Sequence, residues 1–271
     1  MIARAIAQTR EQVRAGLLLA TSYRLNFGLS VIGRFWWIVW VYFLAKLVPA
    51  ARASSPEMAR GYFAFALIGV AFQQYLSNLL VAGSEKVRED ELNGLLPALL
   101  VTPAHPFVSL FGPALWSVVD RAATLVLMIA IGAWAVGLSF PGAHWGTALV
   151  IVLLATLSVA AWGILSACFT LVFKRGDPIV LLAGILGFVF SGAYFPIDIL
   201  PPWMRVISAV YPHAYAISAV RRVLLDGASF HDVAGQVLAL FGFAVILVPV
   251  AILSLHASLA RVRKQGNAAH Y

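Results

Sequence analysis

The feature that most constrains this chain is a set of six long apolar stretches, which fill most of its 271 residues. Hydrophobic residues make up 62% of the sequence and charged residues 11%, so there is too little polar surface to cover a water-soluble globule of this size. The stretches approach or exceed the roughly 20 residues that a helix needs to cross a bilayer. Because a lipid-facing backbone must satisfy its own hydrogen bonds, and strand-like alternation is absent, the spans are predicted to be helices. The sequence therefore predicts an all-α membrane protein.

We expect six transmembrane helices in a single domain of residues 1–271, at about 27–48, 62–82, 115–138, 145–173, 179–195 and 233–257. The fourth run is longer than one membrane thickness and is expected to tilt or protrude. The fifth is short, with glycines that allow close helix contact. Residues 1–26 carry scattered charges and lack the compact apolar core of a signal peptide, so they are predicted to form an interfacial helix.

The distribution of Lys and Arg predicts the orientation, because cationic loops tend to stay cytoplasmic. With six spans both termini share a side, and that side collects twelve cations: Arg4, Arg10, Arg14, Arg24, Lys86, Arg88, Arg121, Lys174, Arg175, Arg261, Arg263 and Lys264. The opposite side collects six: Lys46, Arg52, Arg60, Arg205, Arg221 and Arg222. Both termini are therefore expected in the cytoplasm, and the net charge of +8 is read as attraction for anionic lipid, with no nucleic-acid partner.

The connection after the second span, residues 85–103, combines charge with a leucine face. Its first half is charged, and its leucines then recur at the spacing of an amphipathic helix, which suits a membrane surface or a groove on a partner. A solvated loop followed by a buried turn is the plainer alternative. The residues expected to meet a partner are Glu85, Arg88, Glu89, Glu91, Leu92, Leu95, Leu96, Leu99 and Leu100.

The segment between the fifth and sixth spans, residues 196–222, is apolar but repeatedly broken by proline. Four prolines cannot lie inside one straight spanning helix without losing backbone hydrogen bonds, so we expect short helical pieces that dip into the outer interface. An ordinary extracellular loop is the alternative. The residues singled out in and beside this segment are Gly192, Phe195, Pro196, Pro201, Trp203, Pro212 and Arg221.

The sequence shows no catalytic, cofactor-binding or metal-binding motif. Cys168 is the single cysteine and is expected to be a packing residue, and the six histidines are dispersed without ligand spacing, so no metal site is predicted. No catalytic triad, nucleophile elbow or phosphate-cradling glycine loop is present. We therefore expect a protein that is not an enzyme and binds no cofactor itself.

The two unusual segments together resemble the type-2 ABC transporter permeases, in particular the drug-resistance and antibiotic-efflux branch. The first motif is matched by Arg88-Glu89-Asp90-Glu91, Gly94, Leu95 and Leu99-Leu100-Val101-Thr102-Pro103, and the second by Ser191-Gly192, Phe195-Pro196, Leu200-Pro201, Trp203, Pro212, Ala219 and Arg221. Asn93 and Pro97 depart from the family pattern, and Pro97 is expected to break or restart the helix, so that the cytoplasmic segment forms two short pieces. The six-span layout agrees with the family, so the resemblance covers nearly the whole chain.

This resemblance implies a membrane subunit of an exporter in the plasma (inner) membrane, with cytoplasmic coupling elements and outer re-entrant helices. It implies two copies of an ABC ATP-binding subunit, which hold the ATP and Mg, and a second permease copy as a homodimer or paralogous heterodimer. The expected substrate is an amphipathic drug or a lipid. A polysaccharide or lipid-linked glycan exporter, a secondary transporter and a membrane-bound biosynthetic enzyme are the alternatives, the first being one that the family permits.

Four residues are candidates for the substrate path: Arg34, Trp37, Asp120 and Arg121. Charges near hydrocarbon are costly and are usually paired or turned toward a water-filled face. Asp120 and Arg121 start the third span, where an inner-boundary ion pair and a place in the path are both open. The aromatic run around Trp37 either offers a stacking surface or anchors the span against lipid.

Overall fold

The computed structural model describes residues 14, 18, 24–47, 61–95, 106–173 and 178–265, and within these ranges every regular element is helical. Most of the predicted interfacial helix at 1–26 lies outside the described residues. So do residues 96–105, which include the second half of the predicted connection at 85–103. The all-α prediction is confirmed for the part of the chain that the structure describes.

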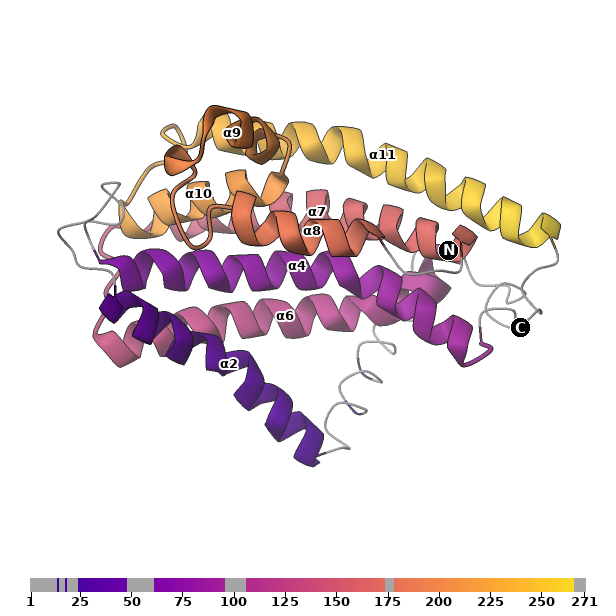
Figure 1. Cartoon of the computed structure of the whole chain (residues 1–271), viewed down its shortest axis with the longest axis horizontal. Coiled ribbons are helices and arrows are strands. Elements are labelled where there is room, and N and C mark those ends of the chain that lie inside the picture. The colour runs from indigo at the N-terminus through magenta and orange to yellow at the C-terminus, as the bar shows by residue number, and fades with distance from the viewer. Residues whose placement is uncertain are drawn as a thin grey trace.

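The helices form one elongated bundle with short pieces at one end (Figure 1). We name the end that carries α9 and α10 the outer end, and the end at which α4 finishes the inner end. The helices are α2 (Arg24–Leu47), α4 (Tyr62–Leu92), α6 (Pro106–Val136), α7 (Trp145–Phe173), α8 (Pro178–Phe190), the 3-10 turn η2 (Ile197–Ile199), α9 (Pro202–Ala209), α10 (Pro212–Leu225) and α11 (Ala234–Gln265).

Four of these helices contain stretches that are long and apolar enough to cross a membrane: Tyr62–Leu92, Trp116–Val136, Trp145–Phe173 and Ala234–Val262. They correspond to the second, third, fourth and sixth predicted spans. Helix α2 has 24 residues but is not one of the four, and α8, with 13, is shorter than a bilayer crossing requires. The count of six therefore stays a prediction, while a multi-pass membrane protein is established.

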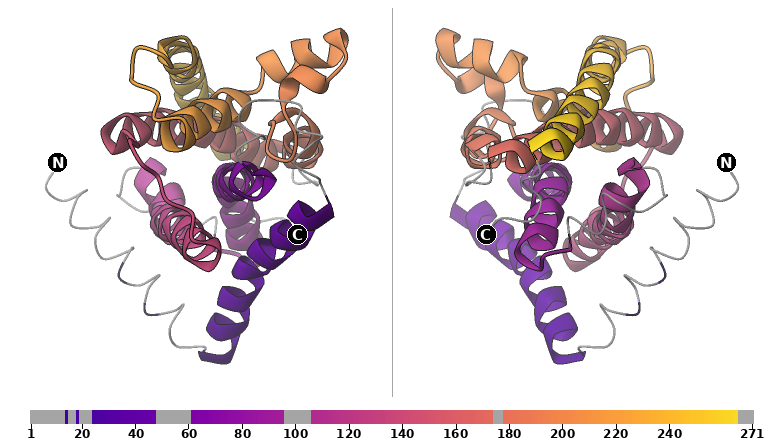
Figure 2. Two further views of the ribbon diagram at one scale, coloured as in Figure 1. Left: turned by 90° about the vertical axis from the view of Figure 1, so that its left-hand side faces the viewer. Right: turned by 90° about the vertical axis from the view of Figure 1, so that its right-hand side faces the viewer.

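Helix α4 forms the core of the bundle. It packs against α2, α6, α7, α8 and α10, and the end-on views place it at the centre of the other helices (Figure 2). Phe65, Leu67 and Leu76 are fully buried along it. The Tyr75 hydroxyl and Thr156 Oγ1 are 2.8 Å apart, which ties α4 to α7. The chain thus surrounds its second predicted span with the others.

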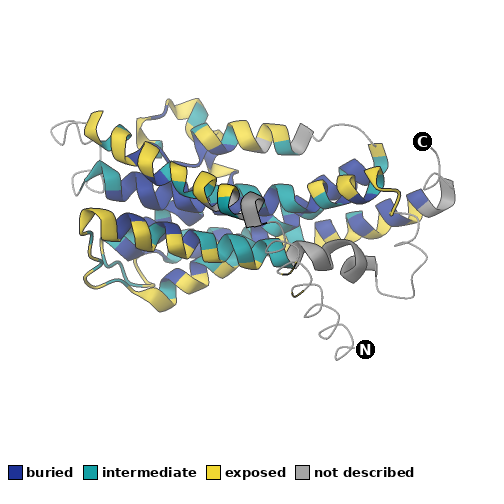
Figure 3. Ribbon diagram, turned by 90° about the horizontal axis from the view of Figure 1, so that it is seen from below, coloured by how far each residue is buried: buried dark blue, intermediate teal, exposed yellow. Residues whose placement is uncertain are grey.

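The outer faces of α2, α6 and α11 carry the exposed apolar side chains (Figure 3). Trp36, Trp134 and Leu253 are each more than three-fifths exposed, as expected of surfaces that meet lipid. Between α7 and α11, the Ser158 hydroxyl donates to the Leu240 carbonyl at 3.0 Å, which satisfies a buried polar group inside the bundle. Trp36 belongs to the aromatic run of the first predicted span, and the exposure of that run places it largely on the outer face of α2.

The predicted limits of three spans were wrong at their inner ends, and α6 begins at Pro106 instead of 115. Helix α4 continues ten residues past the predicted end at 82, through Leu92, and α11 continues to Gln265 instead of 257. A hydropathy profile ends where charged residues begin, whereas the backbone hydrogen bonds of a helix continue through charged residues that reach water. The fifth span is shorter than predicted, because α8 ends at Phe190 before the turn at Ser191 and Gly192.

Candidate functional site

The charged residues of the predicted connection at 85–103 form the last two turns of α4 rather than a separate element. Glu85, Arg88 and Glu89 are exposed, while Val87 is fully buried against Cys168, Leu255 and neighbouring apolar residues of α7 and α11. Lys86 Nζ lies 2.8 Å from Asp90 Oδ1 and 3.3 Å from Glu89 Oε2. One face of the helix end is thus anchored in the bundle, and the other is free to meet a partner.

Helix α4 ends in a hydrogen-bonded cap at Gly94. The Leu95 amide donates to the Asp90 carbonyl at 2.8 Å and the Gly94 amide to the Glu91 carbonyl at 3.0 Å, with Gly94 in the left-handed region at φ +66°. This is a Schellman cap, in which glycine is favoured because other residues are strained there.

The predicted helix with Leu92 and Leu95 on one face is therefore wrong at its start. Leu92 is the last helical residue, and Leu95 lies beyond the cap. Both are exposed, Leu92 by 77% and Leu95 by 49%, so they still present apolar surface beside the charged turns. Glu91 is half-buried, and Leu96, Leu99 and Leu100 lie outside the described residues.

The segment after α8 is made of short helical pieces. Helix α9 begins with Pro202 and α10 with Pro212, each at a first-turn position where the missing amide hydrogen is not needed. Of the residues singled out from sequence, Gly192, Pro196, Pro212 and Arg221 are buried, Phe195 is half-buried, and Pro201 and Trp203 are exposed. A re-entrant position of these pieces in the membrane stays a prediction.

Arg221 holds the outer segment against α4. Its Nε donates to the Phe65 carbonyl at 3.0 Å, and its Nη1 and Nη2 donate to the Gly192 and Ala193 carbonyls at 2.6 Å each. The guanidinium carbon lies 3.5 Å from the centroid of the Phe65 ring. Only 3% of the residue is exposed. A buried charge needs such compensation, because its removal from water is costly.

Gly69 makes room for this guanidinium. A Cβ at position 69 would lie 1.9 Å from Arg221 Nη2 and 2.3 Å from the Ala193 carbonyl oxygen. Any other residue would therefore displace the contact between α4 and the outer segment. Sequence reasoning missed Gly69, since a glycine inside an apolar run carries no signal of what approaches it.

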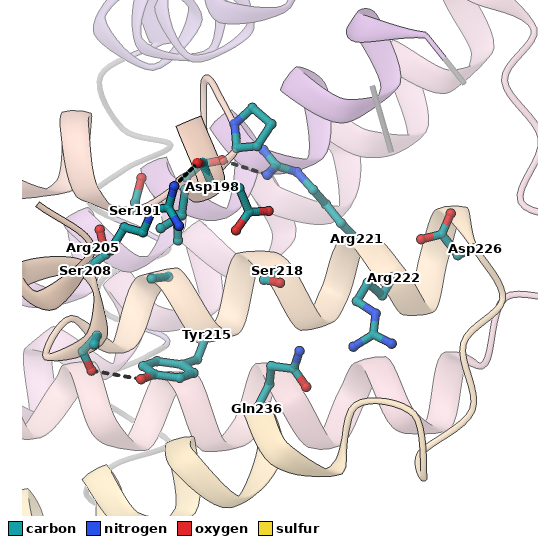
Figure 4. A pocket seen from close by; sticks show the side chains of 15 residues that line it. Ser191, Asp198, Arg205, Ser208, Tyr215, Ser218, Arg221, Arg222, Asp226 and Gln236 are labelled. Carbon is teal, nitrogen blue, oxygen red and sulfur yellow. Dashed lines mark hydrogen bonds between the residues drawn. The ribbon is translucent and has the colours of Figure 1, made fainter. Parts of the chain in front are cut away.

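A cavity of about 550 Å³ opens between η2, α9, α10 and the start of α11 (Figure 4). Arg205 of α9 and Arg222 of α10 lie at opposite sides of the view, and Asp198 and Asp226 also line the cavity. Arg205 Nε donates to the Leu200 carbonyl at 2.8 Å, so the side chain is held by its own segment. In the nearby turn, the Ser229 hydroxyl and amide donate to Asp232 and hold the pKa of that carboxyl below its usual range.

The four predicted path residues lie together between α2, α4 and α6. Arg34, Trp37 and Arg121 line a cavity of about 300 Å³, which we call the α2–α4–α6 pocket; its other lining residues are Gly33, Ala71, Gln74, Tyr75, Asn78, Thr124, Leu125 and Met128. Asp120 adjoins it, because Arg34 Nη1 donates to Asp120 Oδ1 at 2.8 Å. Arg34 Nη1 also donates to Thr124 Oγ1 at 3.2 Å.

A second cavity of about 140 Å³ lies next to this pocket toward the inner end, and we call it the mouth cavity. Asn78 and Arg121 line both, and the mouth cavity adds Ala82, Ser117, Glu85, Lys86 and Glu89. Polar residues thus lead from the charged end of α4 to the middle of the bundle. Charges held at this depth are costly and are usually paired or turned toward a water-filled face.

Among the described residues, no group of His, Cys, Asp or Glu is arranged to hold a metal ion. The buried polar residues Gln73 and His213 were not singled out from sequence. Gln73 donates to Ser77 Oγ at 2.9 Å, and the His213 ring stacks on Tyr211 with centroids 4.2 Å apart. Their burial inside apolar helices is set by the packing of α4 and α10, which local sequence does not encode.

Comparison with known proteins agrees with this arrangement. The family model described as "ABC-2 type transporter" matches residues 55–225, which run from just before α4 to the end of α10. The chain is also similar to the linearmycin resistance permease protein LnrN of Bacillus subtilis (strain 168), with 29% identity over 119 residues. The aligned part covers 43% of this chain but only 31% of that relative. Since the family model covers more than half of the chain, the chain belongs to the ABC-2 type transporter family, as a transmembrane permease.

Proposed function

We propose that this chain is the membrane-spanning subunit of an ATP-driven exporter, which moves an amphipathic drug-like or lipid substrate outward and is energised by a separate ATP-binding subunit. The ATP and Mg belong to that subunit, of which two copies serve a pair of permeases, the second permease being an identical or a paralogous chain. Export fits the similarity to a resistance permease, whose name refers to linearmycin. The substrate of this chain is proposed by class alone.

The observation that carries the proposal is the continuity of α4. One helix of 31 residues runs from Tyr62 at the outer end to Leu92, and its last turns are the charged, partly exposed surface at the inner end. A helix with unbroken backbone hydrogen bonds moves as a rigid unit. A partner that binds and displaces the end of α4 therefore acts directly on the core of the bundle.

The exposed surface at this end has the composition that docking requires. Arg88 and Glu89 offer opposite charges that fix the orientation of a partner, while Leu92 and Leu95 offer apolar area. We define the docking surface by these four residues together with Glu85. Nucleotide binding does work on the permease only to the extent that the partner binds its two states with different affinity.

The substrate path in this proposal passes through the α2–α4–α6 pocket. Its lining combines charged and amide side chains with Trp37, Leu125 and Met128, and an amphipathic molecule needs both kinds of surface. The docking surface lies on the cytoplasmic side, as the excess of cations predicts, with both termini on that side of the inner membrane.

The test is co-purification of an ATP-binding subunit with this chain from its native cells. We expect Leu92→Asp with Leu95→Asp to reduce recovery of that subunit by about tenfold, because a charge must be desolvated on an apolar contact surface. Both side chains are exposed, so the fold of the permease is expected to survive. The measurement is the ratio of ATP-binding subunit to permease after affinity purification in mild detergent.

Leu47→Asp is the matched control, because Leu47 is also 77% exposed but lies at the outer end of α2. Its recovery of the ATP-binding subunit should equal that of the parent. Equal recovery by the double variant would show that the end of α4 is not the docking surface. Absence of any ATP-binding subunit with the parent chain would overturn the proposed function itself.

A further inference from the structure

We propose that the α2–α4–α6 pocket binds the anionic headgroup, a phosphate or a carboxylate, of an amphipathic molecule. The inference names the ligand class of the pocket and rests on the proposed function only for the pocket's part in export. It is carried by the guanidinium of Arg121, which has no hydrogen-bond partner among the described residues, by the connected cavities and by the apolar side chains that line them.

The first step concerns charge. Arg34 and Arg121 approach one carboxylate, that of Asp120. Arg34 Nη1 is 2.8 Å from Asp120 Oδ1, whereas Arg121 Nε is 3.8 Å from Asp120 Oδ2, which is too long for a hydrogen bond. Among the described residues, no other ion pair of Arg121 is found. Glu85, which lines the mouth cavity with Arg121, is a second carboxylate that acts on this cation through space. Among the described residues, however, the guanidinium of Arg121 has no hydrogen-bond partner, so its donors are available to a ligand.

The second step concerns where this charge lies. The side chains of Arg34 and Asp120 are 21% and 19% exposed and that of Arg121 is 33% exposed. Arg34 lies within α2, and Asp120 and Arg121 lie in the first turns of the candidate span Trp116–Val136. Water screens a cation there less than at a free surface. An anion from a ligand would complete the coordination of Arg121, and a guanidinium binds phosphate and carboxylate oxygens in a planar, two-point geometry.

The third step concerns the space for the ligand. The α2–α4–α6 pocket and the mouth cavity share Arg121 and Asn78, so the cation is reached from the charged inner end. Glu85 and Glu89 line the mouth, and Lys86 is held by Glu89 and Asp90, whereas the guanidinium of Arg121 at the deeper position makes no hydrogen bond within the part of the chain that the structure describes. Trp37, Leu125 and Met128 then offer contact to an alkyl or ring portion.

Helix α2 makes this site open to the side. It contacts α4 and α6 and diverges from them toward Arg24 (Figure 1). Gly33, on the face of α2 that lines the pocket, has nothing within 4 Å of a Cβ built on it. The pocket therefore has free volume beside Arg34, and that volume can be filled by substitution without disturbing a charge.

The experiment measures binding of dodecyl phosphate to the full chain, purified without a partner in dodecyl maltoside. Native mass spectrometry gives the fraction of chains that retain one dodecyl phosphate across a titration. We expect one molecule per chain, and Arg121→Gln should raise the apparent Kd by about tenfold, because it removes the guanidinium that would bind the anionic headgroup. Dodecyltrimethylammonium, which has the same chain and the opposite charge, should not be retained.

A steric variant keeps the test valid should the charge variant fold poorly. Gly33→Leu fills the pocket and retains every charge, and leucine favours a helix more than glycine does. It should also lose dodecyl phosphate. Gly28→Leu on the same helix is the matched control, since Gly28 likewise has nothing within 4 Å and does not line the pocket. Lys46→Gln controls for the removal of a cation elsewhere.

Two outcomes would overturn the inference: parental binding by both Arg121→Gln and Gly33→Leu, or equal loss in the Gly28→Leu and Lys46→Gln controls. Displacement of dodecyl phosphate by phosphatidylglycerol, but not by phosphatidylcholine, supports the site and assigns it to a membrane lipid. Retention against both supports it and assigns it to a single-chain solute. No ATP-binding subunit enters this assay, so its result is independent of the docking test.

Discussion

A single arginine connects α4 to the outer segment. The guanidinium of Arg221 donates hydrogen bonds to carbonyl oxygens of α4 and of the turn after α8, and it stacks on Phe65. Three charge-assisted hydrogen bonds in a dry site stabilise the contact more than exposed bonds would. The outer segment is therefore held directly against α4.

Replacement of Arg221 by lysine is expected to destabilise the protein. A lysine keeps the charge but cannot place donors on the Phe65, Gly192 and Ala193 carbonyls at once, so buried acceptors and an ammonium are left poorly compensated. We expect the free energy of unfolding to fall by about 3 kcal/mol. Thermal unfolding in detergent, followed by intrinsic tryptophan fluorescence, measures it.

Arg205→Lys is the control for this prediction. Arg205 also donates to backbone carbonyls, those of Leu200 and Asp198, but it is exposed and its partners lie within its own segment. Its replacement should change the unfolding free energy by less than about 1 kcal/mol. Equal effects of the two substitutions would mean that Arg221 does not hold the outer segment to α4.

The sequence predicted the segment in which Arg221 lies, but it did not predict the partners of this side chain. It was counted among the outer cations and identified by resemblance, and nothing pointed to Phe65 or Gly69. The partners Phe65 and Arg221 are 156 positions apart, so only the packing of α10 on α4 brings them together. Asp120 and Arg121 were easier to identify as candidate site residues, because a charge pair beside an apolar run is visible in the sequence itself.

At the scale of elements, α4 shows what hydropathy can and cannot define. The sequence predicted a span to residue 82 and a separate amphipathic helix, whereas one helix continues to Leu92. Transfer to lipid depends on side chains, but helix continuity depends on backbone hydrogen bonds, and no proline or glycine interrupts residues 85–92. Asn93-Gly94 is the stop signal that the leucine spacing obscured.

This continuity can be tested by breaking α4 between the span and the docking surface. In Ala82→Pro the proline removes one backbone hydrogen bond and clashes with the preceding turn, at a cost of about 3 kcal/mol. We expect the ATP-binding subunit still to co-purify, because the docking surface is intact, while substrate stimulation of its ATPase activity is lost. Both quantities are measured on the reconstituted complex.

Ala82→Gly is the matched control, since glycine keeps the amide hydrogen at the same position and weakens the helix by only about 1 kcal/mol. It should retain most of the stimulation. Should Ala82→Pro fold and keep full stimulation, force does not pass along α4, and another route, such as the contact of α11 with α7, would have to carry it.

At the scale of the whole molecule, the number of membrane crossings depends on α2 and α8. Helices α4, α6, α7 and α11 contain stretches long and apolar enough to cross, while α2 and α8 are not among them in the described residues. The arrangement of the bundle still constrains both. Helix α8 lies beside α4 and runs toward the outer end, where α9 and α10 lie (Figure 1). A helix of 13 residues is too short to cross a bilayer without further residues, such as those of the buried turn that follows it.

Membrane-impermeant thiol labelling decides the number, because Cys168 is the chain's single cysteine and is buried. In a Cys168→Ala background, a cysteine replaces Leu18 before α2, Asn93 after α4, or His231 before α11, and all three positions are exposed. Six crossings with cytoplasmic termini predict labelling of intact spheroplasts at 231 alone, and of 18 and 93 only after permeabilisation. Labelling at 18 in intact spheroplasts would mean that α2 does not cross, and protection at 231 that α8 does not. If α2 does not cross, the α2–α4–α6 pocket has one wall at the membrane surface. Labelling at 18 therefore also decides whether the ligand of the pocket enters from the bilayer or from water.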